Sequence, residues 1–390
     1  MNIHLLYDNN YSQWFIESVE AFFPKNQDRF IVYNPSGTMD KKPLYVSHYR
    51  CESLPILEKG QLRLDEQIPL KGVKNLIIHF YDEGLGQHIR EIPAHIIVKW
   101  VVWGADMYVP ISNYLDGQLD LFSLKYYKSL DISLFFNQRL RITLSQIKEW
   151  YGLHSSYYKK KKHQKRVLDV ERVDEIYTYL DGDYNQIIEN YGIKKKIQYY
   201  CFAYQYVGKQ ISIDTKNCVT SNMIQVGHNA TPFNNQFSII SKLSAFDTNF
   251  DIIIPLSYGD KKFAQKLKYN AQSFKNLKPN YLDTLLPYAE YQKLMDNVKI
   301  HIFNNRRQEA MGNILQCVAN GKKVYLSEKN TGFEFLKKIG CLIFSVETDL
   351  TLPNSLSQDL NSEEKCNNRE RVAEFFSKEN YIIRLQKLLS

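Results

Sequence analysis

Strand-sized runs of apolar residues, alternating with segments of helical spacing, constrain this sequence more than any other feature. Val73–Tyr81, Ile96–Trp103 and Ile252–Leu256 are largely apolar over the length of one strand. Such a run is typical of a strand buried on both faces of a parallel sheet. Segments such as Tyr11–Phe23, with apolar residues along one helical face, alternate with these runs. The sequence therefore predicts an α/β fold built from β-α-β units.

The β-α-β alternation occurs twice, which indicates two doubly wound, Rossmann-like domains. The chain of 390 residues is too long for one ordinary core, since single domains usually hold about 100–200 residues. We expect one domain over 1–210, a second over 211–362, and C-terminal helices over 363–390 that can pack back on the first domain. Two such domains create a cleft between the carboxyl ends of their sheets, where ligands of these folds bind.

Composition favours an anionic partner and a reducing compartment. The net charge of +8 is a mild excess that suits a nucleotide diphosphate, an anionic lipid or a nucleic acid. Tyrosine is abundant, with 28 copies, which suits sugar sites and membrane interfaces but is also common in AT-rich bacterial genomes. The six cysteines form no C-x-x-C pair, so we expect a cytoplasmic protein with reduced thiols.

A basic run marks the middle of the chain and suggests a membrane surface. Lys159, Lys160, Lys161 and Lys162 begin a stretch with six cations in eight positions. It is either a solvated helix face or an attachment to an anionic bilayer, where each cation contributes roughly 1 kcal/mol. No run approaches the ~20 apolar residues that a membrane-spanning helix needs. We expect the first residues of the chain to form a strand and not a signal peptide. Nucleic acid is a less favoured partner, because no stacking motif accompanies the run.

Polar residues follow the strands of the second series. Gly227 lets a ligand approach the backbone closely, and His228, Asn229 and Asn234 come before a helix whose N–H groups attract anions. A plain turn with an asparagine cap would give the same pattern, so both interpretations stay open. Tyr258, after the next strand, can stack on a base or bond a sugar, or belong to an ordinary turn.

A pair of arginines at a helix start predicts an anion site. Arg306 and Arg307 oppose the positive end of the helix dipole, and a bound diphosphate would relieve that conflict. Gly312 gives close access in the first turns of the helix, and Asn313 can bond a donor group. The histidines show no paired metal-ligand spacing, so we predict no metal site.

Two titratable residues end strands of the first series. Asp106 follows the strand Ile96–Trp103 and is placed to act as a base or to accept a sugar hydroxyl, although it can also cap a helix. His79 ends the preceding strand and is either a catalytic group or a buried core histidine.

Taken together, these residues resemble a known family. The order and spacing of the motifs are similar to those of the bacterial TDP-N-acetylfucosamine:lipid II N-acetylfucosaminyltransferases, glycosyltransferase family 56. The resemblance spans roughly 70–340 and is carried by His79, Trp103 to Asp106 with Tyr108, Val226 and Gly227 with Asn234, Pro255 with Tyr258, and Arg307 and Gln308 with Gly312.

The resemblance implies a GT-B fold, in which two Rossmann-like domains face each other across a cleft, with a dTDP-sugar donor and no cofactor. The acceptor would be an undecaprenyl-diphosphate-linked saccharide or another glycolipid, and the protein would be peripheral at the cytoplasmic face of the inner membrane. The donor site would hold Gly227, His228, Asn229, Asn234, Tyr258, Arg307, Gln308, Gly312 and Asn313; catalysis would use Asp106 and His79; the acceptor or membrane would meet Trp103, Tyr108 and Lys159 to Lys162. The alternative is a non-catalytic module that binds sugar nucleotides or polysaccharide.

Overall fold

The chain folds into two compact units, each built around its own sheet. The computed structural model describes residues 1–33, 45–48, 50–53, 68, 70–108, 118–123, 153–213, 221–246, 250–274, 276–277 and 279–390. Unit 1 comprises 1–112, 152–204 and 378–390, and unit 2 comprises 113–151 and 205–377. The expected boundaries lay after 210 and 362. In the structure the later boundaries lie after Tyr204 and Ser377, so the last helix belongs to unit 1.

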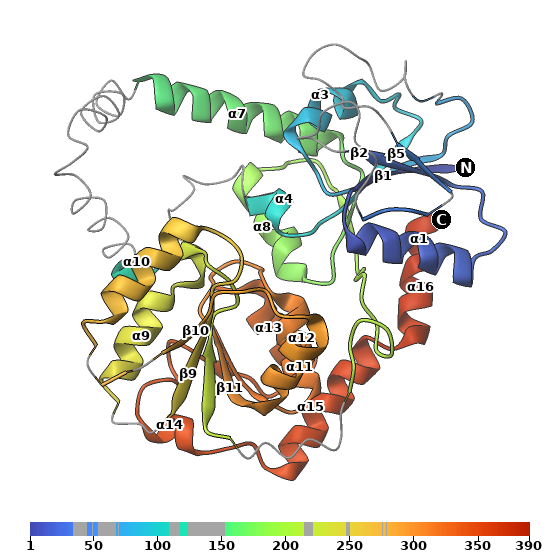
Figure 1. Cartoon of the computed structure of the whole chain (residues 1–390). Coiled ribbons are helices and arrows are strands. Elements are labelled where there is room, and N and C mark those ends of the chain that lie inside the picture. Colours follow the sequence, from blue (N-terminus) through green and yellow to red (C-terminus); the bar gives the residue numbers. More distant parts are fainter. Residues whose placement is uncertain are drawn as a thin grey trace. The chain divides into compact units, whose positions relative to one another are not determined.

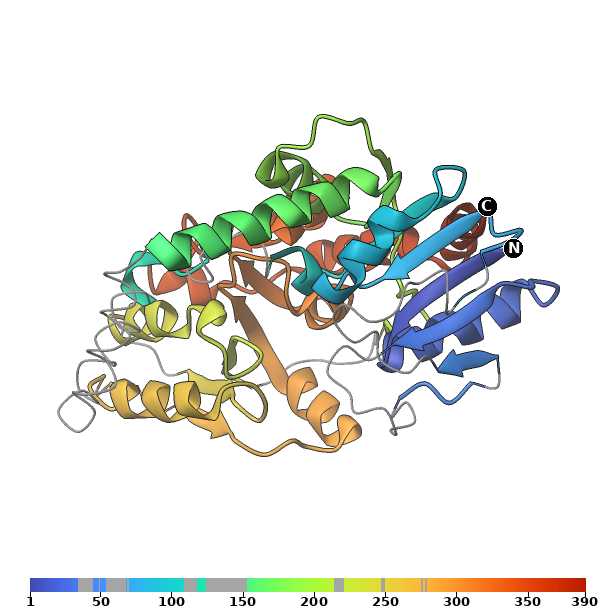
Figure 2. The ribbon, with the colours of Figure 1, turned by 90° about the horizontal axis from the view of Figure 1, so that it is seen from above.

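Unit 1 is a parallel sheet of seven strands in the order β3-β2-β1-β4-β5-β6-β7 (Figure 1). The strands are β1 (Asn2–Tyr7), β2 (Arg29–Tyr33), β3 (Cys51–Ser53), β4 (Asn75–His79), β5 (Ile97–Val101), β6 (Glu175–Tyr177) and β7 (Gln198–Tyr200). The helices are α1 (Asn10–Phe22), α3 (Glu83–Glu91), α4 (Ala105–Tyr108), α7 (Leu153–Arg172), α8 (Asp181–Tyr191) and α16 (Lys378–Leu389). The predicted apolar runs in this unit contain β4 and β5. Helix α7 packs along α3 (Figure 2).

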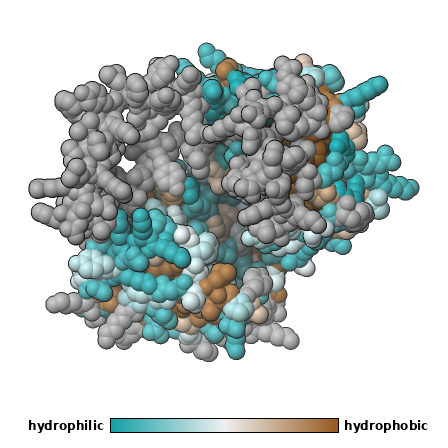
Figure 3. Space-filling model, turned by 45° about the horizontal axis from the view of Figure 1, so that its top comes forward, coloured by the Kyte–Doolittle hydropathy of each residue, from teal (hydrophilic) through white to brown (hydrophobic). Residues whose placement is uncertain are grey.

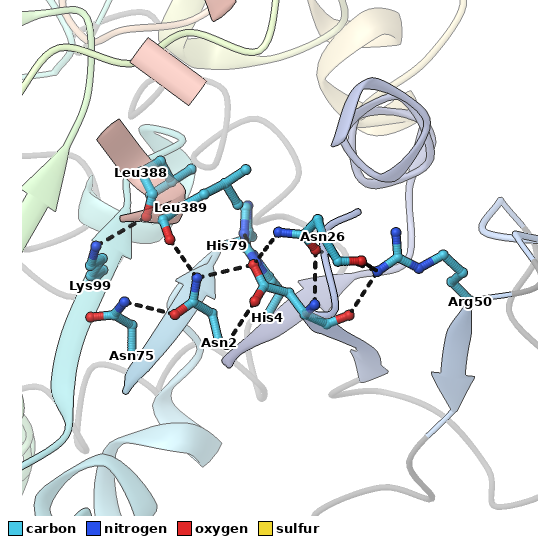
Figure 4. Close-up of polar contacts among 10 residues, drawn as sticks. Asn2, His4, Asn26, Arg50, Asn75, His79, Lys99, Leu388 and Leu389 are labelled. Carbon is cyan, nitrogen blue, oxygen red and sulfur yellow. Dashed lines mark hydrogen bonds and ion pairs between the residues drawn. The ribbon is translucent and has the colours of Figure 1, made fainter. Parts of the chain in front are cut away.

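The last helix of the chain is fixed to the amino ends of the unit 1 strands. Lys99 donates to the carbonyl of Leu388 at 3.1 Å, and the Asn2 side chain donates to the carbonyl of Leu389 at 2.7 Å (Figure 4). These bonds satisfy carbonyl groups that a helix C-terminus otherwise leaves unpaired. Tyr381 of α16 is buried as well, so this helix belongs to the core of unit 1.

Unit 2 is a parallel sheet of six strands in the order β10-β9-β8-β11-β12-β13. The strands are β8 (Met223–Val226), β9 (Asp251–Pro255), β10 (Asn280–Leu282), β11 (Val298–Phe303), β12 (Lys323–Leu326) and β13 (Phe344–Ser345). The helices are the 3-10 turn η2 (Pro232–Asn234), α9 (Gln236–Ser244), α10 (Lys261–Ala271), α11 (Tyr288–Asn297), α12 (Met311–Ala319), α13 (Thr331–Lys338), α14 (Asn354–Ser357) and α15 (Ser362–Phe375).

Both sheets reverse their strand order at one point. The chain moves outward from β1 in unit 1 and from β8 in unit 2, then crosses back to add β4 and β11 on the other side. Loops that leave these neighbouring strands at their carboxyl ends diverge, and ligands of doubly wound sheets bind in the resulting crevice. The fold therefore directs attention to the loops after β1 and β4, and to those after β8 and β11.

The described surface is mixed in polarity. In Figure 3 the coloured residues are mostly hydrophilic, with smaller groups of hydrophobic residues among them. Within the described ranges, no helix combines the length and the apolar character that crossing a bilayer requires. The same residues contain no group of three or more metal-ligating side chains placed to hold an ion.

Candidate functional site

The loops after β8 and β11 form a dense polar site at the switch point of unit 2. Gly227 directly follows β8 with a positive φ of 70°, and a Cβ atom there would lie 2.6 Å from the amide nitrogen of Gln236. Glycine thus allows both the turn and the close approach of α9. Asn234 ends the 3-10 turn η2, and Asn235 adopts a left-handed conformation that separates this turn from α9.

Asparagine side chains hold this loop in place. The Asn234 amide donates to the carbonyl and the side-chain oxygen of Asn229 at 2.9 and 2.7 Å. Asn235 donates to the carbonyl of Asn304, which follows β11, and so ties the two loops together. Asn229 and Asn234 were predicted as ligand contacts, whereas here they also build the loop. Asn235 and Asn304 were missed, because their partners are distant in the sequence.

A short segment from 118 to 123 fastens both loops. Asp120 accepts hydrogen bonds from Ser238 at 2.5 Å and from Asn304 at 3.1 Å. Its own backbone N–H donates to the side-chain oxygen of Asn235 at 2.8 Å. The carboxylate of Asp120 is therefore a structural link, and nothing in its local sequence indicated this role.

Arg307 lies in the same site and is held from several sides. Its guanidinium stacks over the ring of Phe233, 3.9 Å from the centroid. It forms an ion pair with Glu309 and donates to the side chain of Gln118 at 3.4 Å. The side chains of Arg307 and Glu309 are 12% and 20% exposed, so this pair is shielded from water but still reachable by a ligand.

Buried polar atoms without partners cluster around Arg307. Among the described residues, the atoms without a hydrogen-bond partner include Gln236 Oε1, Asn305 Oδ1, Arg307 Nε and Glu309 Oε2. Buried polar groups are almost always hydrogen-bonded, so each such atom needs an explanation. Because all four come from the loop after β11 or the turn that begins α9, a polar ligand at this edge accounts for them together.

His228 supplies a neutral ring to this cluster. Burial lowers its pKa, although nearby Glu309 opposes the shift. A neutral imidazole can donate from one nitrogen and accept at the other, which suits a ligand rich in hydroxyl or phosphate oxygens.

Tyr258 is half exposed and lies beside the loop after β8. Its carbonyl accepts a hydrogen bond from the backbone N–H of Ala230 at 2.9 Å. Gly259 follows with φ of 108°, and a Cβ atom there would overlap the carbonyl of Ala230. The close backbone contact fixes Tyr258 beside Ala230 of the loop after β8.

The N-terminus of α12 faces the loop that carries Arg307. Helix α12 begins at Met311, because Ala310 adopts a left-handed conformation with φ of 58°. Arg306 and Arg307 therefore lie in the loop before the helix and not, as predicted from the sequence, at its start. Gly312 and Asn313 lie in its first turn, and Gln308 lies in the loop before it. The first N–H groups of a helix have no partner within it and attract anions.

In unit 1, Asp106 is a buried anchor. Its carboxylate accepts hydrogen bonds from the Trp100 indole at 2.8 Å and from the backbone N–H groups of Tyr81 and Trp103 at 3.1 and 2.9 Å. The residue is 3% exposed, and burial raises its pKa. These contacts fit a positioning role better than that of a base that meets substrate. They do not make Asp106 a helix cap, because it lies inside α4 and all three donors lie outside that helix.

His79 is enclosed in a hydrogen-bonded chain. It is fully buried, and its two ring nitrogens lie 2.9 Å from His4 Nδ1 and 2.6 Å from the hydroxyl of Tyr204. Burial and the neighbouring His4 hold its pKa well below the usual range. The core-histidine interpretation matches these surroundings, and Tyr204 is the partner that the sequence did not reveal.

The remaining predicted residues are placed as follows. Trp103 is half-buried at the carboxyl end of β5, whereas Tyr108 is 8% exposed and its hydroxyl lies 3.4 Å from Asp183. That carboxylate sits within the first turn of α8 and does not cap the helix, which begins at Asp181. Lys159 to Lys162 belong to α7, but their side chains lie outside what the structure describes.

Comparison with solved structures identifies the fold. The chain is similar to sucrose-phosphate synthase from Thermosynechococcus elongatus, with a TM-score of 0.63 and 10% identity over 100% of this chain and 98% of that one. It is similar to Anabaena HepE in complex with UDP, with a TM-score of 0.62 and 10% identity over 99% and 98%. It is also similar to a glycosyltransferase from Rickettsia africae, with a TM-score of 0.61 and 12% identity. That match covers 100% of this chain and 97% of the other.

No protein-family model matches the chain, and no curated protein matches it in sequence. Two parallel-sheet α/β domains and full-length similarity to these structures define the GT-B fold, as predicted. The similarity at these identities establishes the architecture, and the chemistry of the site is argued from its own residues.

Proposed function

We propose that this chain is a glycosyltransferase that takes its sugar from a nucleotide donor bound at the unit 2 switch point. The cluster of unpartnered buried polar atoms around Arg307 carries the proposal. A nucleotide sugar presents phosphate oxygens and hydroxyl groups at close spacing, and so offers both acceptors and donors to this cluster. The GT-B neighbours support it, since HepE is described in complexes with UDP and with UDP-glucose.

Arg307 and the start of α12 would stabilise the leaving diphosphate. When the bond between the sugar carbon and the phosphate oxygen breaks, negative charge grows on that oxygen. A fixed guanidinium and the unpaired N–H groups of a helix N-terminus stabilise such charge without reorganising. The acceptor hydroxyl forms the new bond to the sugar carbon, and its proton passes to a phosphate oxygen of the departing diphosphate. Asp106 and His79 are buried inside unit 1, so we assign them to positioning.

The finer identity of the substrates follows from the resemblance. We propose a dTDP-linked deoxy or acetamido hexose, such as N-acetylfucosamine, as donor, and a lipid-linked saccharide of surface polysaccharide or lipopolysaccharide synthesis as acceptor. The basic run at 159–166 supports a location at the anionic face of the inner membrane, because clustered cations bind acidic lipids.

Nucleotide binding tests this proposal directly. Thermal unfolding of the full chain would be followed with dTDP, UDP, GDP, CMP and ADP in turn. We expect one or two nucleoside diphosphates to raise the midpoint, because a ligand that binds only the folded state stabilises it. If no nucleotide changes the midpoint, the proposed donor site is wrong. Binding without any turnover of the matching nucleotide sugar would instead favour the non-catalytic module.

A further inference from the structure

Two buried asparagine side chains hold the loop that joins β11 to α12. The Asn330 amide donates to the carbonyl groups of Asn305 and Arg307 at 3.0 and 2.7 Å. The Asn305 amide donates to the carbonyl groups of Arg307 and Glu309, both at 3.2 Å. Both asparagines are buried, so water does not compete for these bonds. We call this arrangement the asparagine clamp.

The bonding partners of the clamp settle which way each amide faces. A carbonyl oxygen only accepts hydrogen bonds, so each asparagine turns its NH2 group, and not its oxygen, toward the loop. The oxygen of Asn330 accepts the backbone N–H of Gly332 at 2.9 Å and so caps the start of α13. One side chain therefore joins α13 to the loop after β11.

The clamp turns the carbonyl groups of this loop to one side. In a trans peptide unit, the carbonyl group and the N–H group of the next residue point in opposite directions. The peptide units here are trans, and the carbonyl groups of Asn305, Arg307 and Glu309 face the two amides. The N–H group that follows each of them therefore faces away from the clamp. Successive N–H groups on one side of a loop attract anions.

The end of the loop is held in a strained conformation. Ala310 has φ of 58° and ψ of 19°, a left-handed conformation that residues with a Cβ atom rarely adopt. The carbonyl group just before it, that of Glu309, is held by Asn305. Helix α12 begins at the next residue, so its first N–H groups, which have no partner within the helix, adjoin the loop. Strain that the surroundings hold in place occurs mainly at sites that bind or react.

The Glu309 carboxylate makes the direction of the backbone important. It pairs with Arg307 and so neutralises part of the charge that would attract a phosphate group. Carbonyl oxygens on the same side would repel an anion further, and the clamp keeps those of the loop turned away. Arg307 Nε is buried without a partner among the described residues, which is an independent sign that a ligand binds here.

We infer that Asn305 and Asn330 are positioning residues for the diphosphate of the donor. By holding the carbonyl groups of the loop away from the phosphate oxygens, they make the loop and the start of α12 an anion site. The inference rests on the proposed function, which places a nucleoside diphosphate beside Arg307. Neither asparagine has to touch the ligand, so their effect is expected on the affinity for the diphosphate group itself.

Replacing Asn330 by serine and by aspartate tests the clamp. Both residues cap helices well, but neither has an NH2 group to donate to the loop. Calorimetric titration of the full chain with UDP, dTDP and inorganic pyrophosphate gives the dissociation constants. We expect both variants to bind the nucleoside diphosphate and pyrophosphate roughly tenfold more weakly, because freed carbonyl groups can turn toward the anion. The loss should be the same for both ligands, whereas a merely structural role would not single out pyrophosphate.

A second cap of the same unit is the matched control. Asn361 caps α15 by accepting the backbone N–H of Glu364 at 2.9 Å, and it lies at the surface. Asn361→Ser and Asn361→Asp should keep the wild-type affinities. Asn305→Ser removes the other half of the clamp in a residue that caps no described helix, and it should weaken pyrophosphate binding as the Asn330 variants do.

The outcomes separate this inference from the donor site. Wild-type affinities in the Asn330 and Asn305 variants overturn the clamp and leave the donor site in place. A loss confined to Asn330→Asp also overturns it, because the added negative charge would then explain the effect, and so does a wild type that binds UDP or dTDP but not pyrophosphate. Pyrophosphate binding that depends on Asn330, in a protein that binds neither nucleotide, keeps the anion site and refutes the donor proposal. Binding of none of the three refutes both.

Discussion

Replacing Arg307 by methionine tests the donor site at its charged centre. Methionine keeps an unbranched apolar side chain but removes the guanidinium, which stacks on Phe233, forms an ion pair with Glu309 and has an unpartnered Nε. One charge-assisted hydrogen bond to a diphosphate contributes about 2 kcal/mol, so we expect roughly 30-fold weaker binding. Arg307→Lys keeps the positive charge but not the paired donors of the planar guanidinium, so we expect it to lose less nucleotide affinity than Arg307→Met. Titration calorimetry with the best nucleoside diphosphate gives both dissociation constants.

A matched arginine in the same unit controls for charge and folding. Arg371 of α15 also pairs with a glutamate, Glu374, but is 46% exposed. Arg371→Met should leave nucleotide affinity unchanged and shift stability little, because exposed ion pairs contribute about 0–1 kcal/mol. If both methionine variants bind the nucleotide as tightly as wild type, Arg307 does not contact the diphosphate and the reasoning fails.

Three further perturbations test the supporting structure. Gly259→Ala should lower the unfolding midpoint more than Gly208→Ala, because both have positive φ but only the first would meet a backbone carbonyl; equal losses would contradict the close contact. Asp106→Asn should destabilise the fold by about 1–3 kcal/mol in denaturant titration, because the NH2 group of asparagine would face N–H donors that the carboxylate now accepts. An unchanged unfolding midpoint would exclude the anchoring role. Burial alone would raise the pKa of Asp28, but hydrogen bonds including that from His4 lower it to about 2. The ionised carboxylate therefore stabilises the folded state above pH 3.8, and this contribution is lost as the pH falls toward 2. Asp28→Asn should therefore cost most at neutral pH, with the gap to wild type closing over that range, and a constant gap in pH-dependent melting would refute this.

The fold was predictable because burial leaves a local pattern. The apolar runs Val73–Tyr81, Ile96–Trp103 and Ile252–Leu256 contain β4, β5 and most of β9. The two-domain architecture followed from the repeated alternation. The position of Gly227 after a strand was equally visible, since a glycine at such a turn carries its own conformational signal.

The inside of the site was less predictable because its contacts join distant residues. Asp120 bonds to Asn235 across 115 positions and to Asn304 across 184. No local spacing encodes such partners. The chain from Trp103 through Tyr204 to His79 likewise depends on three elements meeting, so the sequence placed His79 correctly at a strand end but left its role open.

Sugar transfer is the most direct test of the central claim. The full chain would be incubated with UDP-glucose or dTDP-linked sugars and a bacterial lipid extract, and mass spectrometry would follow both the released nucleoside diphosphate and the glycosylated lipid. We expect the two products in equal amounts, lost in Arg307→Met and retained in Arg371→Met. Tight nucleotide binding with no transferred sugar from any donor would contradict the account and identify the chain as a binding module.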